Sequence, residues 1–343
     1  MKKIVLLSLA VSLVACKAQQ PKEIEEANVM EYANTITPDE LQEHLYTFAS
    51  DEFEGRETGE PGQKKAAEYL KNEYKKLDMP SPMGGDDYFQ EVPESAFSRG
   101  KVKASENVLA YIKGSSKPEE YLVISSHYDH VGMDEQGNVY NGADDDGSGT
   151  VAILEIAEAF TKAVEDGYRP KRSILFLNNT GEEKGLVGSK WYTDHPVIPL
   201  AQTVADLNID MIGRVGEGKE DAGDYVYLIG SDKLSTELHE LSEEVNNKYT
   251  NLELDYTYND ENDPNRFYYR SDHYNFAKHD IPIIFYFNGV HEDYHQMTDT
   301  PDKINYDLLA KRAKLVFLTA WEVANRDQRP FVDKPTLTEA TAE

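Results

Sequence analysis

Residues 121–129 read Tyr121-Leu122-Val123-Ile124-Ser125-Ser126-His127-Tyr128-Asp129, and this stretch decides the fold. Its first half is an apolar, β-branched run, which is typical of a strand buried on both faces of a sheet. A histidine and an aspartate follow at once. Sites in parallel sheets form beyond the carboxyl ends of the strands. The stretch therefore predicts a largely parallel sheet with a site that begins at His127 and Asp129.

Outward from this stretch, predicted strands alternate with predicted helices. Apolar runs predict strands, and apolar residues that recur every three or four positions predict helices. This alternation indicates an α/β fold, a three-layer sandwich with a mixed and mostly parallel central sheet. The predicted strands cover residues 108–112, 121–125, 173–177, 204–208, 225–229 and 281–286, and the predicted helices cover 37–48, 66–77, 148–164, 186–193, 234–249 and 306–323.

Four further polar segments follow predicted strands or occupy Gly-flanked turns, and they complete a candidate two-metal site. Two nearby divalent cations need several nitrogen and oxygen ligands from separate segments. His127 and Asp129 face the same way in an extended chain, so the Asp129 carboxylate can orient the ring of His127. The four segments are Gly142-Ala143-Asp144-Asp145-Asp146-Gly147, Gly181-Glu182-Glu183, Asn208-Ile209-Asp210-Met211 and Tyr294-His295.

Taken together, these motifs resemble the M28 family of zinc aminopeptidases, from roughly residue 36 to roughly residue 325. The segment from Glu182 to Ser189 and the segment Ser271-Asp272-His273 carry the same resemblance. It implies a zinc-dependent exopeptidase fold and two Zn²⁺ ions per chain, with other divalent metals as an alternative.

The resemblance also implies which residues bind the metals. His127 and Asp210 would bind one zinc ion. Glu183 and His295 would bind the other, and Asp144 would bridge the two.

The implied catalytic residues are Glu182, the general base, and Asp129, which would orient the first histidine ligand. A cis peptide bond is expected at Asp144-Asp145, after the implied bridging residue. Tyr268 stands where a relative has a tyrosine near the reacting carbonyl, and the adjacent Tyr269 is the alternative. Aromatic packing explains this tyrosine pair equally well.

The implied activity is metal-dependent removal of N-terminal residues from peptides. The two ions would lower the pKa of a shared water, and Glu182 would take its proton and later return it to the leaving amine. The substrate would be a peptide with a free N-terminus, because an acidic rim and a metal favour an α-amine.

Three other functions remain open at this point. A glutaminyl cyclase would share the fold but resembles a one-zinc site with tryptophans around the substrate, whereas this chain has only Trp191 and Trp321. A carboxypeptidase or dipeptidase of related fold would need a basic clamp, for which Arg214 and Arg270 are candidates. A non-catalytic peptide-binding lipoprotein would have lost a ligand or the base, and none is lost.

The remaining histidines are not expected to be ligands. His291-Glu292-Asp293-Tyr294-His295 matches the His-Glu-x-x-His pattern, but that motif requires a helix, and this segment follows a strand and a turn. His295 is therefore the expected ligand and His291 is not. His130 and His273 lie beside aspartates and are interpreted as structural residues or as residues that support the ligands, rather than as ligands.

The N-terminus predicts export and lipidation. Residues 1–16 contain a basic start, an apolar run too short to span a bilayer, and Leu13-Val14-Ala15-Cys16, which resembles a lipobox. Residues 17–35 are predicted to be a flexible tether, 36–326 a single peptidase domain, and 327–343 a disordered tail. A lipid at Cys16 would be the only membrane attachment, placing the protein at the outer membrane, facing the periplasm or the cell surface.

The formal net charge of −28 argues against a nucleic-acid partner. Acidic surfaces repel phosphates, and no basic groove is visible in the sequence. The same charge favours cations, including metal ions and the ammonium end of a peptide.

Overall fold

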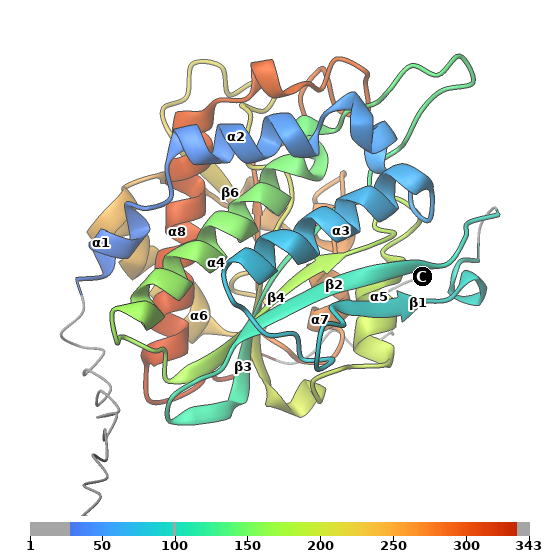
Figure 1. The fold of residues 1–343 in the computed structure, drawn as a ribbon. Helices are drawn as coiled ribbons and strands as arrows, with labels where there is room; N and C mark the ends of the chain where they lie inside the picture. Colours follow the sequence, from blue (N-terminus) through green and yellow to red (C-terminus); the bar gives the residue numbers. More distant parts are fainter. Residues whose placement is uncertain (1–27, 99–100, 335–343) are drawn as a thin grey trace, which may run out of the picture.

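The computed structural model describes residues 28–98 and 101–334 (Figure 1). The predicted signal peptide, Cys16 and residues 335–343 lie outside the described residues. In the part that the structure describes, no helix has the length and apolarity needed to cross a membrane.

The centre of the fold is a mixed sheet of eight strands in the order β1-β2-β4-β3-β5-β8-β6-β7. The central strands β4, β3, β5 and β8 run parallel, and the sheet turns antiparallel where β2 joins β4 and β6 joins β8. The mixed, mostly parallel sheet is therefore confirmed. The strands are β1 (Phe89–Val92), β2 (Ser105–Ile112), β3 (Lys117–His127), β4 (Arg172–Asn179), β5 (Thr203–Ile209), β6 (Tyr225–Ile229), β7 (Glu253–Asp255) and β8 (Ile283–Phe287).

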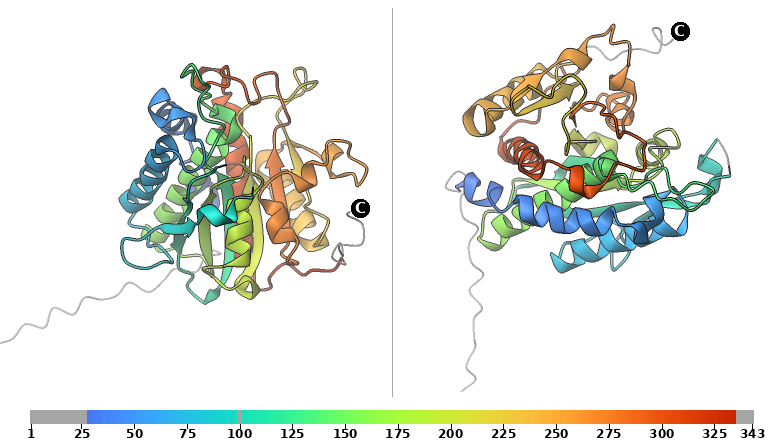
Figure 2. Two further views of the ribbon diagram at one scale, coloured as in Figure 1. Left: turned by 90° about the vertical axis from the view of Figure 1, so that its right-hand side faces the viewer. Right: turned by 90° about the horizontal axis from the view of Figure 1, so that it is seen from above.

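Helices cover both faces of this sheet, as the three-layer prediction requires. Figure 1 shows α3 and α4 in front of the strands, and Figure 2 shows the same layers from two further sides. The helices are α1 (Val29–Ala33), α2 (Pro38–Phe48), α3 (Pro61–Lys76), α4 (Gly149–Glu165), α5 (Val187–Asp194), α6 (Thr236–Val245), α7 (His273–Ala277) and α8 (Tyr306–Asn325).

Successive side chains of the strands point to opposite faces of the sheet and pack into two hydrophobic cores. Leu122 and Ile124 of β3 pack into one core with α1, α2, α3, α4, α6 and α8. Val123, between them, packs into the other core with Tyr192 of α5 and Phe276 of α7. Burial on both faces explains why this strand reads as a continuous apolar run.

The predicted start of α2 is confirmed by its cap. Thr37 Oγ1 accepts a hydrogen bond from the Glu40 backbone N–H at 3.3 Å and donates one to the Glu40 carboxylate at 2.6 Å. Pro38 occupies the first helical position, where its missing N–H costs nothing.

The described parts of the predicted tether and tail, residues 28–35 and 327–334, contact the domain. Residues 29–33 form α1, and Tyr32 stacks on Trp321 of α8 with ring centroids 5.9 Å apart. At the other end, Arg329 donates to the Thr203 carbonyl at 2.9 Å, and Asp333 accepts from the Thr236 N–H at 3.0 Å. Both segments therefore pack on the domain, because each has side chains that reach it.

Candidate metal centre

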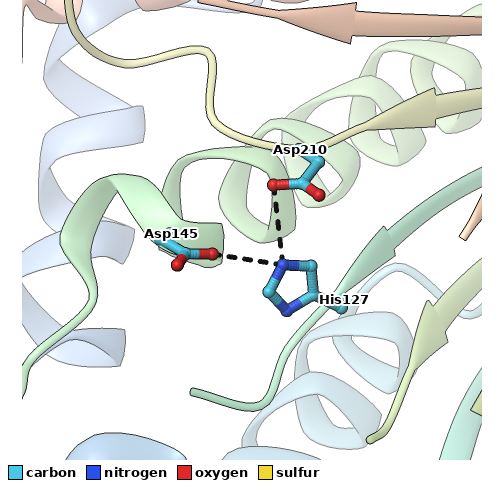
Figure 3. Close-up of side chains that lie close together, drawn as sticks. All are labelled: His127, Asp145 and Asp210. Atoms are coloured by element: carbon cyan, nitrogen blue, oxygen red, sulfur yellow. Dashed lines mark ion pairs between the residues drawn. The ribbon is translucent and has the colours of Figure 1, made fainter. Parts of the chain in front are cut away.

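His127 ends β3, and its ring lies beside two carboxylates (Figure 3). His127 Nε2 is 3.3 Å from Asp145 Oδ1 and 3.6 Å from Asp210 Oδ1. Asp210 follows β5, which is parallel to β3, and Asp145 lies in the turn before α4. All three residues are buried. They form one group of nitrogen and oxygen atoms close enough to hold a metal ion.

A second group shares Asp145. His295 Nε2 is 2.9 Å from Asp145 Oδ2 and 3.0 Å from Glu183 Oε1. His130 Nδ1 is 3.6 Å and 3.3 Å from the same two oxygens. His130, Asp145 and Glu183 are a second set of potential metal ligands. Because its two oxygens face different groups, the Asp145 carboxylate lies between them.

The structure places Asp145, and not the predicted Asp144, between the two groups of potential ligands. Asp144 Oδ1 accepts a hydrogen bond from the Gly213 N–H at 2.7 Å, and Asp144 Oδ2 contacts His291 Nε2 at 3.0 Å. The cis peptide bond joins Asp145 and Asp146, and the expected one at Asp144-Asp145 is therefore wrong. Adjacent side chains leave this turn in different directions. Because three aspartates follow one another, the sequence alone does not indicate which of them lies between the two groups.

The buried atoms of both groups fit divalent cations because, apart from ion-pair contacts within the groups themselves, the protein gives them no hydrogen-bond partner. Leaving a buried polar atom unpaired costs about 1–3 kcal/mol, and such atoms are rare. Imidazole and carboxylate donors suit zinc. The unpaired atoms are His127 Nε2, both ring nitrogens of His130, Asp145 Oδ2 and Glu183 Oε1.

Asp129 connects the first histidine to the predicted base in an unexpected way. His127 Nδ1 is 3.1 Å from the backbone oxygen of Asp129, but 3.7 Å from its carboxylate. The carboxylate instead accepts hydrogen bonds from the Glu182 N–H at 3.2 Å and from Thr58 Oγ1 at 2.6 Å. Asp129 thus holds His127 through its main chain and the Glu182 loop through its side chain. Removal from water raises the pKa of the Glu182 carboxyl well above its usual value.

Asp210 is held by the Ser-Asp-His segment that the sequence singled out. Ser271 Oγ donates to Asp210 Oδ2 at 2.6 Å and accepts from Asn208 Nδ2 at 3.0 Å. The serine thereby leaves the other oxygen, Oδ1, facing His127.

A cleft opens beside these groups. Asp145, Glu182 and Asp210 line it, so the predicted base faces the same space as the shared carboxylate. The other lining residues are mostly apolar or aromatic, with one cation. They are Met211, Phe267, Arg270, Phe285, Phe287, Val290 and Tyr294.

Tyr268 and Tyr269 do not line this cleft, so the structure does not place them where substrate contact was predicted. Both face a neighbouring cavity bounded by Lys233 and Tyr258, among others. The segment forms a 3-10 turn, in which side chains three positions apart share a face. Phe267 and Arg270 share the face that reaches the cleft, while the two tyrosines turn away.

Two further predictions concerned the His-Glu-x-x-His match and the arginines that could bind a substrate carboxylate. Residues 291–295 form turns with no helix, so the rejection of the His-Glu-x-x-His match is confirmed. Of the two candidate clamps, Arg214 is paired with Asp293 at 2.8 Å. Arg270 is the candidate that reaches the cleft.

Arg56 is a buried residue that sequence reasoning missed, since it lay in a segment interpreted only as a loop. Its Nε donates to the Tyr128 carbonyl at 2.9 Å, and its two Nη atoms donate to the carbonyls of Asn141 (2.7 Å) and Gly142 (2.8 Å). Arg56 therefore joins the end of β3 to the turn that carries Asp145. His130, which the sequence analysis did not count among the ligands, lies beside Asp145 and Glu183 of the second group.

Comparisons with known proteins cover the region that carries these residues. Peptidase family M28 matches residues 107–320. Aminopeptidase NAALADL1 of Mus musculus is 34% identical over 132 residues, which make up 38% of this chain and 17% of that protein. Probable glutamate carboxypeptidase LAMP1 of Arabidopsis thaliana is 34% identical over 106 residues, which make up 31% of this chain and 14% of that protein. The chain thus spans less than a fifth of the length of these two relatives.

Among solved structures, BSAP, a zinc aminopeptidase from Bacillus subtilis, has a similar fold. It matches with a TM-score of 0.61 at 18% identity, covering 86% of this chain and 98% of that one. The likeness therefore extends over nearly all of the solved protein, at the level of the fold.

Proposed function

This chain belongs to peptidase family M28, and from that premise we propose that it is a zinc-dependent aminopeptidase. One observation carries the proposal. The carboxylate of Asp145 lies between two groups of nitrogen and oxygen donors, and Glu182 faces the same cleft. A shared carboxylate with a free carboxylate beside it suits hydrolysis assisted by two metals.

In this proposal the two metals have separate ligands besides Asp145. His127 and Asp210 hold one, and Glu183 and His295 hold the other. When bound, the zinc ions lower the pKa of a water and polarise the scissile carbonyl. Glu182 takes the proton from that water and delivers it to the leaving amine. Asp129 keeps Glu182 in place through the hydrogen bond from the Glu182 N–H.

The cleft supports an exopeptidase that prefers apolar N-terminal residues. The net charge of −28 and the Glu182 carboxylate in the cleft favour the free α-ammonium group of a peptide. The phenyl rings of Phe267, Phe285 and Phe287, which also line the cleft, offer an apolar surface to the first side chain. A peptide with a blocked N-terminus loses the first of these interactions.

A carboxypeptidase is the second candidate, and Arg270 is the observation that favours it. Its side chain lines the cleft, where a guanidinium can bind a substrate carboxylate in bidentate fashion. The hypothesis that the protein is a glutaminyl cyclase has less support. Trp321 packs against Tyr32 in the core, and Trp191 stacks on His195, so neither tryptophan lines the cleft.

The test is a peptide panel analysed by mass spectrometry. Each peptide is supplied with a free and with an acetylated N-terminus, and its first residue is Leu, Phe, Ala, Glu, Gln or Lys. Stepwise loss of apolar N-terminal residues from free peptides alone, stopped by a chelator and restored by zinc, is the expected result. C-terminal trimming would indicate the carboxypeptidase, and loss of ammonia from N-terminal Gln peptides would indicate a cyclase. Bound metal without any reaction would indicate a binding protein.

The proposal includes export and lipid anchoring through Cys16, at the outer membrane. Its basis is the sequence of residues 1–16, which lie outside the described residues. Wild-type protein should partition into detergent and a Cys16→Ser variant into water. Equal partitioning of the two would contradict the anchor.

A further inference from the structure

His130 is a wholly buried histidine whose two ring nitrogens have no hydrogen-bond partner. Its position is fixed by the main chain. The His130 N–H donates to the Arg56 carbonyl at 3.1 Å. Its ring lies against Gly142, where an added Cβ would approach the ring carbons to 2.5 Å. An imidazole held in place this firmly, with neither nitrogen satisfied, calls for a partner other than a protein group.

The ring points at the oxygens of the second group. Its Nδ1 is 3.3 Å from Glu183 Oε1 and 3.6 Å from Asp145 Oδ2, contacts that are ion pairs only when the ring is protonated. Donor atoms around a four-coordinate zinc, each about 2.0–2.1 Å from the ion, lie about 3.3 Å apart. The observed spacing is that of atoms facing a common ion. We propose that His130 is a further protein ligand of the metal held by Asp145, Glu183 and His295.

This inference rests on the proposed metal sites, and it gives the two sites different numbers of protein ligands. The first group offers three side chains, His127, Asp145 and Asp210. With His130, the second group offers four. A further donor raises affinity, so the four-donor site fills first and releases its metal last. The open positions that a substrate and a water need are then concentrated at the three-donor site, where catalytic metals keep them.

The test counts imidazoles around the first metal bound. Full-length metal-free protein receives one equivalent of zinc, and X-ray absorption fine structure reports the number of histidine ligands. Two imidazoles are expected if His130 and His295 share the first ion. One imidazole would overturn the proposal, since that count describes either His127 alone or His295 alone. This measurement needs no variant, so misfolding cannot obscure it.

A matched pair of variants supplies an independent readout. His130→Gln should weaken the tighter site at least about 10–100-fold in competition with a coloured chelator, the range found for outer-shell partners of metal ligands. His273→Gln is the control, because His273 is equally buried and belongs to neither group. Unchanged affinity in folded His130→Gln protein would also overturn the proposal. Failure of the proposed function looks different, because a chain that binds no zinc at all gives no histidine signal in either experiment.

Discussion

Three consecutive aspartates do three different things in this protein. Asp144 accepts from the Gly213 N–H, and Asp145 lies between the two donor groups. Asp146 accepts hydrogen bonds from the N–H groups of Met211 (2.9 Å) and Gly149 (3.0 Å). The carboxylates of Asp144 and Asp146 therefore accept hydrogen bonds from backbone N–H groups, and only the carboxylate of Asp145 contacts both donor groups.

This division of roles predicts opposite metal contents for two similar variants. Asp145→Asn should lower bound zinc below one ion per chain, because both groups lose a shared ligand. Asp144→Asn should keep two ions and lose stability instead, by about 1–3 kcal/mol for the buried bonds. Elemental analysis after dialysis, together with thermal unfolding, separates these outcomes. Loss of zinc from Asp144→Asn alone would restore the original assignment of the bridge.

Glu182 offers the second prediction at this scale. Glu182→Gln keeps the shape of the side chain but removes the carboxylate that accepts a proton. Turnover should fall by about 10²–10⁴-fold, the usual contribution of a general base. Zinc content should stay unchanged, since Glu182 belongs to neither donor group. The exposed Glu244→Gln is the matched control. Normal turnover in Glu182→Gln would eliminate Glu182 as the base.

Residue types could be predicted from the sequence better than residue positions. The histidine at the end of β3, the Glu182-Glu183 pair and Asp210 lie where strand ends place them. The choice among three aspartates depends on the path of a turn, which no spacing rule fixes. The place of the His130 ring beside the second group depends on its contacts with Gly142 and Glu183, both of which are distant from it in sequence.

At the scale of elements, the strongly periodic segments were predicted and the short edge segments were not. β3 and β4 are apolar on both faces and long, so their sequence signal is unambiguous. β1 and β7 have four and three residues at the two edges of the sheet, too few for a period to show. The site was predictable at this scale because parallel strands deliver their ends to one edge.

Helix α4 carries a buried carboxylate that makes stability depend on pH. Glu155 is 1% exposed, and burial, with help from Glu40 and Glu158, raises its pKa to about 8. His44 Nε2 is 3.5 Å from it. The folded chain thus holds a proton that the unfolded chain releases near its ordinary pKa. The contribution of Glu155 is fully present below that ordinary value and is lost as the pH rises toward 8.

Glu155→Gln should remove this dependence, because glutamine does not titrate. Relative to wild type, the variant should gain melting temperature between pH 5 and pH 8.5, by several degrees if the gain is a few kcal/mol. Thermal unfolding at fixed zinc concentration measures the difference. Glu244→Gln on the exposed face of α6 should show no such gain. A constant difference between Glu155→Gln and wild type across this range would contradict the raised pKa.

At the scale of the whole molecule, the site concentrates negative charge in a chain that already carries −28. The cleft is lined by the carboxylates of Asp145, Glu182 and Asp210, and Glu183 belongs to the same donor group as Asp145. Without cations these carboxylates repel one another in a partly buried space, where water screens them poorly. Metal binding should therefore stabilise the entire fold as well as the site.

Chelation should consequently lower the melting temperature, and zinc should restore it. A ligand that binds only the folded state stabilises it by about 2.7 kcal/mol at a hundred times its dissociation constant, so the gain should grow with the logarithm of free zinc. The metal-free protein should recover part of the loss in high salt, because screening weakens the repulsion among the carboxylates. The same chelator saturated with zinc is the control for direct effects on the chain. An unchanged melting temperature after zinc removal, verified by elemental analysis, would mean that the carboxylates are neutralised by protons or by relaxation of the cleft, and that no cation is needed to hold these strand ends together.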